Sequence, residues 1–172
     1  MSDAPATSRL FLALWPSDAV RRSLVEWRDA WRWPSNATPV RAERLHMTLH
    51  FLGNLPTPLV PDLVTGLQVP FTPFELRFGQ AELWPHGVAV LAPKSAPEPL
   101  LDLQASLGVA LQGLGLPVET RAFRPHVTLA RRAGAAAPPT HGPAIRWRVA
   151  GYALMESTLD AGGGYSIVAR FS

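Results

Sequence analysis

Residues 45–49 read Leu-His-Met-Thr-Leu, and residues 125–129 repeat the pattern as Pro-His-Val-Thr-Leu. In an extended strand, alternate side chains point to the same face. Each histidine therefore shares a face with the threonine two positions later, whereas the apolar residue between them and the following leucine face the core. Two such strands brought together would present two imidazoles and two hydroxyls to one small volume. We predict that this volume is the functional site.

Strand and helix patterns alternate around the two motifs. We predict strands at residues 9–15, 45–51, 74–83, 88–92, 123–130, 146–157 and 164–171, and helices at 17–31, 56–67 and 97–114. Ser17 or Asp18 is the predicted N-cap of the first helix, and Gly53-Asn54 is expected to end the strand at 45–51. The third helix is predicted from the helical spacing of Leu100, Leu103, Leu107 and Leu111. Nearly half of the 172-residue chain separates the two histidines. This spacing predicts two similar α+β lobes that face each other across a cleft, with one His strand from each. Neither half has a linker-like border, so we predict a single domain over residues 1–172.

The composition limits the kinds of chemistry that the chain can perform. It contains no cysteine, which excludes disulfides, cysteine metal ligands and a cysteine nucleophile. No run of about 18 apolar residues is present, and residues 1–8 lack a signal-peptide pattern. We therefore expect a cytoplasmic protein that does not enter a membrane.

Arginine dominates the positive charge. Lys94 is the only lysine among 16 basic residues, and the formal net charge is +3. Arginine binds phosphate through a planar fork and suits a nucleic-acid fragment. The overall count is better explained by a bias in base composition, because Ala, Pro and Gly are also abundant. Arginines near the two histidines, such as Arg44 and Arg124, must therefore be judged one by one.

The paired histidines suit hydrolysis of a phosphoester. Opening a cyclic phosphodiester requires a base that activates water and an acid that protonates the leaving oxygen, and two imidazoles can serve as both near neutral pH. Threonine hydroxyls can donate hydrogen bonds to the phosphate, and an arginine can neutralise developing charge. A single histidine on a strand is more often structural. Two copies of one His-x-Thr-Leu unit favour catalysis.

A metal site is the alternative that the spacing of His46 and His50 raises. Histidines four residues apart bind zinc when they lie on a helix. This segment is predicted to be a strand, Met47 stands where a glutamate base would follow the histidine, and no acidic ligand is nearby. We therefore predict no metal. On a strand His50 would share the face of His46 and could line the rim of the cleft.

The two motifs, read with their flanks, resemble a known family. Residues 45–53 (Leu-His-Met-Thr-Leu-His-Phe-Leu-Gly) and 124–131 (Arg-Pro-His-Val-Thr-Leu-Ala-Arg) are similar to the paired signatures of the two-histidine phosphoesterase superfamily. The resemblance is strongest to its RNA 2′,3′-cyclic phosphodiesterases, also called 2′-5′ RNA ligases or LigT-like proteins, and runs through nearly the whole chain. It implies a bilobal α+β fold with two pseudo-symmetric lobes, each with a mainly antiparallel sheet and outer helices, around a central cleft.

The resemblance also implies an activity and its residues. The family hydrolyses RNA 2′,3′-cyclic phosphate ends to 2′-phosphates without a metal or other cofactor, and some members form 2′-5′ linkages reversibly. Carried over, His46 is the acid toward the leaving 3′ oxygen, His126 is the base, and Thr48 and Thr128 hold the phosphate. The two histidines would exchange roles in the ligating direction.

Three further residues match substrate-binding positions of the family. Arg131 matches an arginine that closes the second signature, although on a regular strand it would alternate away from the face of His126. Phe11 matches an aromatic residue that lies against the base, and a core phenylalanine fits the same position. Tyr165 matches an aromatic residue near the end of the chain.

The expected partner is RNA with a 2′,3′-cyclic phosphate end, or a cyclic nucleotide, and the expected oligomeric state is a monomer. A non-catalytic module that binds nucleotides or RNA ends on the same fold is the alternative. Retention of both histidines and both threonines favours the enzyme.

Overall fold

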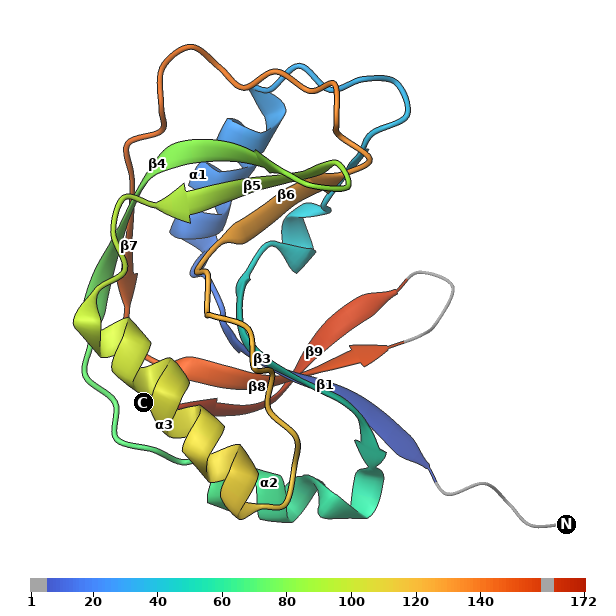
Figure 1. Ribbon diagram of the computed structural model, residues 1–172, viewed down its shortest axis with the longest axis vertical. Coiled ribbons are helices and arrows are strands. Elements are labelled where there is room, and N and C mark those ends of the chain that lie inside the picture. The colour runs from blue at the N-terminus through green and yellow to red at the C-terminus, as the bar shows by residue number, and fades with distance from the viewer. Residues whose placement is uncertain (1–5, 159–162) are drawn as a thin grey trace, which may run out of the picture.

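The computed structural model describes residues 6–158 and 163–172, which fold into two antiparallel sheets (Figure 1). The first sheet has the order β3 (Met47–Pro56), β1 (Thr7–Leu14), β8 (Tyr152–Thr158), β9 (Gly164–Phe171). The second has the order β2 (Thr38–Pro39), β6 (Val127–Arg131), β5 (Val88–Pro93), β4 (Phe74–Trp84), β7 (Ile145–Val149). One His motif therefore belongs to each sheet, as the sequence predicts.

Three helices and two short 3-10 turns complete the fold: α1 (Asp18–Asp29), η1 (Ala42–Arg44), η2 (Thr57–Leu59), α2 (Val60–Gly66) and α3 (Glu98–Gly113). Helix α1 begins where the Ser17 side chain accepts a hydrogen bond from the backbone N–H of Val20, an N-cap that the sequence predicts. Leu24 and Trp27 form its buried stripe. Helix α3 buries four leucines at the predicted helical spacing: Leu100, Leu103, Leu107 and Leu111.

The helices pack across the boundary between the two lobes. Helix α1 follows β1 of the first sheet, yet it contacts β7 of the second. Helix α3 follows β5 of the second sheet and contacts β3 of the first. Each helix therefore links the sheet that it follows to the other sheet.

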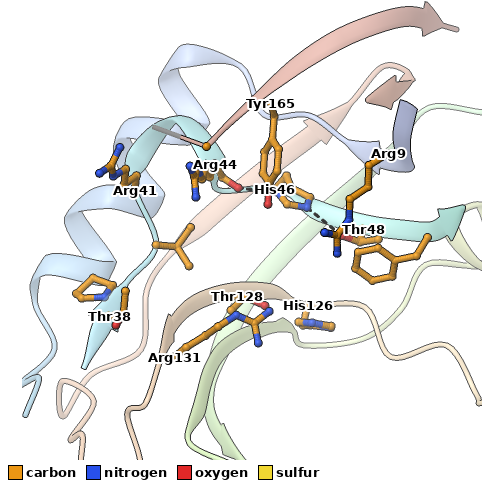
Figure 2. Close-up of a pocket in the computed structure, with 14 residues that line it drawn as sticks. Arg9, Thr38, Arg41, Arg44, His46, Thr48, His126, Thr128, Arg131 and Tyr165 are labelled. Carbon is orange, nitrogen blue, oxygen red and sulfur yellow. Dashed lines mark hydrogen bonds between the residues drawn. The ribbon is translucent and has the colours of Figure 1, made fainter. Parts of the chain in front are cut away.

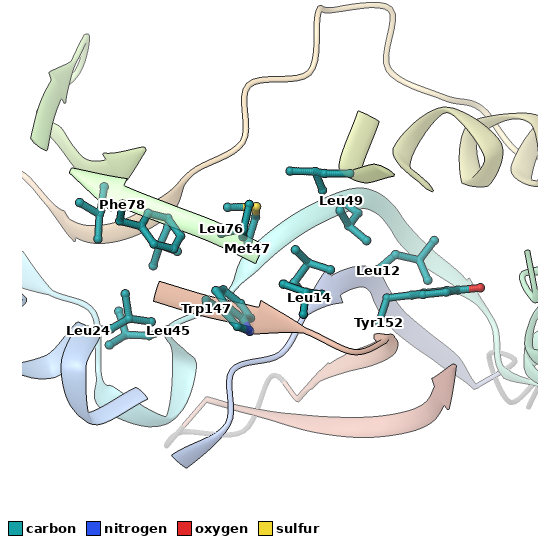
Figure 3. Close-up of a cluster of buried hydrophobic side chains, with 14 of the residues drawn as sticks. Leu12, Leu14, Leu24, Leu45, Met47, Leu49, Leu76, Phe78, Trp147 and Tyr152 are labelled. Carbon is teal, nitrogen blue, oxygen red and sulfur yellow. The ribbon is translucent and has the colours of Figure 1, made fainter. Parts of the chain in front are cut away.

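One hydrophobic core extends over both sheets (Figure 3). Leu12 and Leu14 from β1 and Met47 from β3 join Phe78 from β4 and Trp147 from β7, and each is at most 3% exposed. Burying a side chain of this size is worth roughly 1.5–3 kcal/mol. Met47 and Leu49 of β3 and Val127 and Leu129 of β6 all belong to this core, so packing holds both His motifs in place.

The predicted strand at 146–157 is wrong in one respect. The chain breaks at residues 150–151 into β7 and β8, which belong to different sheets. At the break, a Cβ on Gly151 would lie 2.3 Å from the carbonyl oxygen of Phe171, so only glycine allows the backbone to pass the end of β9. A sequence pattern of Ala150-Gly151 does not reveal this close approach.

Strand β3 also differs from its predicted span of 45–51. It starts at Met47 and continues to Pro56, because the chain passes through the expected stop at Gly53 with a positive φ of 79°. The register with β1 shifts there, leaving Leu52 as an extra residue between the pairs Leu10–Gly53 and Phe11–Phe51. A bulge of this kind bends a strand without ending it.

Candidate active site

Both His motifs open on one cavity of about 810 Å³ between the two sheets (Figure 2). His46 and Tyr165 lie on one side of it, and His126, Thr128 and Arg131 lie on the other. The described residues that line it are Arg9, Thr38, Pro39, Val40, Arg41, Arg44, His46, Thr48, Phe51, His126, Thr128, Arg131, Gly163 and Tyr165. Six of the seven residues that the sequence nominates therefore meet here.

The two imidazoles are held in the same way. Nδ1 of His46 lies 2.6 Å from the carbonyl oxygen of Arg44, and Nδ1 of His126 lies 2.7 Å from that of Arg124. A carbonyl only accepts, so Nδ1–H is the donor in each neutral ring, and Nε2 keeps its lone pair. Nε2 of His46 is 2.9 Å from Oγ1 of Thr48, whose hydroxyl donates to it. In both rings Nε2 is the atom available for proton transfer.

Burial depresses the basicity of both rings. Desolvation lowers the pKa of His46 to about 4, opposed by the hydrogen bond to Arg44 and reinforced by the charges of Arg21 and His126. Desolvation also lowers the pKa of His126, with Arg124 and Arg131 adding to the effect. Both imidazoles are therefore neutral at pH 7 in the free protein. A phosphate anion between them would favour the charged forms and raise both pKa values.

Each His motif contains a β-bulge at its leucine. In β3, Thr48 pairs with Ala13 and His50 with Leu12, which leaves Leu49 as the extra residue. In β6, Thr128 pairs with Val90 and Ala130 with Ala89, which leaves Leu129 as the extra residue. The first five residues of β3 and the five of β6 share one burial pattern: buried, half-buried, buried, buried, exposed. The motifs are thus alike in backbone geometry as well as in sequence.

The bulges decide where two residues point. Arg131 returns to the face of Thr128 because the bulge at Leu129 shifts the alternation by one residue. Without this bulge, regular alternation would turn the Arg131 side chain away from the cavity. The matching bulge in β3 turns His50 away, and its Nε2 instead donates to the carbonyl oxygen of Gln104 in α3 at 2.7 Å. The prediction that His50 shares the face of His46 is therefore wrong.

Phe11 is the one nominated residue outside the cavity wall. It is 4% exposed, and its ring centroid lies 5.0 Å from that of His46 and 4.9 Å from that of Tyr165. The Trp15 ring also stacks on the ring of His46, with the centroids 5.8 Å apart and an interplanar angle of 25°. The structure favours the alternative of a core phenylalanine, which here supports the ring of His46.

Trp84 supports the other histidine, although no local sequence pattern singles it out. Its ring centroid lies 4.3 Å from that of His126, and the guanidinium carbon of Arg124 lies 4.1 Å from its centroid. Its indole N–H donates to a carboxylate oxygen of Glu82 at 2.6 Å. Trp84 therefore contacts both the ring of His126 and the residue whose carbonyl orients that ring.

Four arginines line the cavity: Arg9, Arg41, Arg44 and Arg131. No acidic residue is among its described lining residues. Of these arginines, only Arg44 and Arg131 stood out in the sequence, because Arg9 and Arg41 have no neighbouring motif. The arrangement suits a ligand with more than one negative charge.

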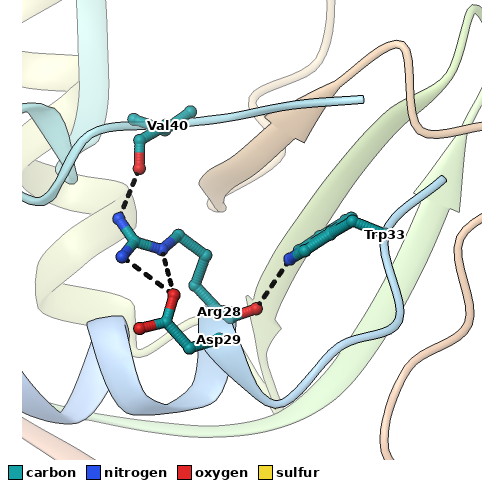
Figure 4. Close-up of polar contacts among 4 residues, drawn as sticks. All are labelled: Arg28, Asp29, Trp33 and Val40. Atoms are coloured by element: carbon teal, nitrogen blue, oxygen red, sulfur yellow. Dashed lines mark hydrogen bonds and ion pairs between the residues drawn. The ribbon is translucent and has the colours of Figure 1, made fainter. Parts of the chain in front are cut away.

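Helix α1 holds the segment that carries two of these arginines (Figure 4). The Arg28 guanidinium donates to the carbonyl oxygen of Val40 at 2.7 Å, and the N–H of Val40 donates to the carbonyl oxygen of Leu129 at 2.7 Å. Arg21 donates to the carbonyl oxygens of Ala42 and Leu45. These bonds anchor the backbone on either side of η1 to the second lobe.

Among the described residues, no three His, Cys, Asp or Glu side chains are grouped so that they could hold a metal ion. No helix in the described part of the chain is long and apolar enough to cross a membrane.

Two His-x-Thr strands from different sheets that open on one cavity define the two-histidine phosphoesterase fold. The chain belongs to the 2′-5′ RNA ligase superfamily, whose family model matches residues 16–160.

Relatives and solved structures agree with this family. A Thermus thermophilus protein named RNA 2′,3′-cyclic phosphodiesterase is 33% identical over 180 residues, covering 95% of this chain and 89% of the relative. An Escherichia coli protein of the same name is 32% identical over 158 residues, covering 89% and 86%. The crystal structure of E. coli LigT complexed with 3′-AMP has a TM-score of 0.85 and 27% identity, covering 96% of this chain and 97% of that chain.

Proposed function

We propose that this protein is an RNA 2′,3′-cyclic phosphodiesterase, which hydrolyses the cyclic phosphate at an RNA end to a 2′-phosphate. The names of its relatives support the activity. The observation that carries the proposal is the matched pair of imidazoles. Each has its Nδ1 fixed by a backbone carbonyl, and both line one arginine-rich cavity.

In this proposal each group has its own role. Once Nε2 of His46 carries a proton it no longer accepts from Thr48, so the hydroxyls of Thr48 and Thr128 can both donate to the non-bridging oxygens of the phosphate. Arg131 offsets the charge of the phosphate. Nε2 of His126 removes a proton from water as the water oxygen attacks phosphorus. The bond from phosphorus to O3′ breaks, and Nε2–H of His46 delivers its proton to O3′. The products are a 2′-phosphate and a 3′-hydroxyl, and the histidines exchange roles in the reverse direction.

Tyr165 and Arg44 form the side of the cavity where the terminal nucleoside would bind. The Arg44 guanidinium carbon lies 5.7 Å from the centroid of the Tyr165 ring, so the two side chains form one surface. An aromatic face beside an arginine is a suitable contact for a base or a ribose phosphate.

The product of a nucleoside 2′,3′-cyclic phosphate tests the assignment directly. With EDTA present, we expect the 2′-monophosphate as the only product, because the proposal gives His46 the proton that O3′ receives. Chromatography against authentic 2′- and 3′-monophosphates makes the measurement. A 3′-monophosphate would reverse the orientation of the histidines about phosphorus, and loss of activity in EDTA would reject the metal-independent mechanism. Binding without turnover would favour a nucleotide-binding module.

The threonines should matter less than the histidines. Thr48→Ala and Thr128→Ala each remove one hydrogen bond to a charged phosphate, and we expect kcat/KM to fall about 5- to 150-fold, equivalent to roughly 1–3 kcal/mol. Serine at either position keeps the hydroxyl and should restore most of the rate. If serine is as damaging as alanine, the hydroxyl is not the group that matters.

A further inference from the structure

Phe51 is the most exposed phenylalanine side chain in the core strands. It is 66% exposed, whereas Phe11, its neighbour across β1 and β3, is 4% exposed. The two ring centroids lie 6.5 Å apart, so Phe51 packs against Phe11, the residue that supports His46. Most of the surface of the Phe51 ring remains exposed. Because Phe51 lines the central cavity, its open ring is available to stack on a base of the bound RNA.

The bulge in β3 is what turns Phe51 outward. Phe51 follows Thr48 by three positions, as Arg131 follows Thr128, and each residue comes two places after the bulged leucine of its motif. Both line the central cavity. Phe51 is therefore the counterpart of Arg131 in the first lobe, with an aromatic ring in place of a guanidinium.

A second cavity of about 570 Å³ lies on the other side of Phe51. It shares Thr48, Phe51 and His126 with the central cavity. The remaining described residues that line it are Leu49, His50, Trp84, Gln104, Glu119, Arg121, Ala122, Phe123 and Arg124. The second cavity is thus continuous with the reaction centre and contains two further aromatic rings.

The charges of the second cavity are mixed but favour an anion. Arg121 lies 3.7 Å from Glu119 and Arg124 lies 3.8 Å from Glu82, both as loose ion pairs between largely exposed side chains. Exposed pairs of this kind are weak and leave the guanidinium groups able to bind phosphate. Aromatic rings next to arginines are the combination that binds single-stranded RNA.

We infer that Phe51 is a stacking platform for the nucleotide that precedes the cyclic phosphate end, and that the second cavity receives this nucleotide. The inference rests on the proposed function. All five groups that act on the phosphate line the central cavity, so the terminal ribose must lie there. Among the described lining residues, the second cavity shares Thr48, Phe51 and His126 with the central cavity, and only Thr48 and His126 of these three act on the phosphate. The second cavity therefore suits the adjoining part of the RNA chain.

The test compares substrates of different length. Wild-type protein should show a higher kcat/KM for a trinucleotide with a 2′,3′-cyclic phosphate end than for the matching nucleoside 2′,3′-cyclic phosphate. Phe51→Ala should lower the ratio of the two values by about 5- to 100-fold, the range for losing one base–aromatic stack. Phe51→Tyr keeps the ring and should keep the ratio. Val109→Ala, a change at a 69% exposed site on α3, is the control and should leave the ratio unaltered.

The outcomes distinguish a failure of the stacking platform from a failure of the proposed phosphodiesterase activity. A wild-type ratio near one, or a Phe51→Ala variant that lowers both rates equally, overturns the stacking platform while the phosphodiesterase stands. Failure of the wild type to open any 2′,3′-cyclic phosphate overturns the proposed function itself. Circular dichroism of each variant separates a folding defect from a lost contact.

Discussion

Replacing His46 or His126 with alanine should lower kcat for a nucleoside 2′,3′-cyclic phosphate by about two to four orders of magnitude, the usual contribution of a general acid or base. The reason is structural. Nδ1 of each ring is hydrogen-bonded to a backbone carbonyl, so Nε2 is the ring nitrogen that can exchange a proton with the substrate. His50 cannot replace either ring, because the bulge turns it toward α3.

The double variant should lose less than the product of the two single losses. Acid and base act in one concerted transfer, so removing the second adds little once the first is gone. His141→Ala is the matched control, because His141 is exposed and does not line the cavity, and it should retain the wild-type rate. The acid–base assignment fails if either single variant keeps near wild-type turnover in pre-steady-state measurements.

The sequence predicts the fold well because local patterns specify its elements. A continuous apolar run predicts β1, and apolar alternation followed by a turn predicts β4 and β5. A cap at Ser17 or Asp18 predicts the start of α1, and the leucine spacing predicts α3. The repeated His-x-Thr unit predicts that two sheets meet at one site. These predictions are confirmed because each depends only on which face of a strand or which stripe of a helix is buried.

The features that the sequence does not predict depend on contacts between distant segments. The bulges at Leu49 and Leu129 exist only relative to β1 and β5, which fix the register of the partner strands. A strict alternation pattern therefore misplaces His50 and leaves the role of Phe51 unseen. The same holds for Trp84, because its contribution to the site is a ring contact with His126, which lies in a distant segment of the chain.

Arginines illustrate the same limit. The high arginine content fits a compositional bias, and nothing local separates a cavity arginine from a surface one. Arg9 and Arg131 lie on different sheets and meet only because the shared core brings β1 and β6 to the same cleft. For Arg131, the family signature predicts a place in the site, whereas the alternation of the strand does not.

The pH profile of kcat/KM should be bell-shaped, with a centre below the ordinary histidine pKa of 6.5. This parameter reports the free protein, in which one imidazole must be neutral and the other protonated. The pKa of His46 is lowered to about 4 and that of His126 is also lowered. Both rings are protonated below the lower of the two values, and both are neutral above the higher. The rate should therefore fall about tenfold per pH unit on each side, and the decline on the basic side should begin below pH 6.5.

The same shifts predict how the profile responds to substrate and to one arginine. A phosphodiester anion between the rings raises both pKa values, so the basic limb of the kcat profile should lie at higher pH than that of kcat/KM. Arg131→Gln removes one of the charges that lower the pKa of His126, so it should move the basic limb of kcat/KM upward. Arg170→Gln, on β9 and outside the cavity lining, is the control and should leave both limbs in place. A kcat/KM optimum above pH 7.5 would show that burial does not set the proton affinity of these rings, and the acid and base would then have to be sought elsewhere in the cavity.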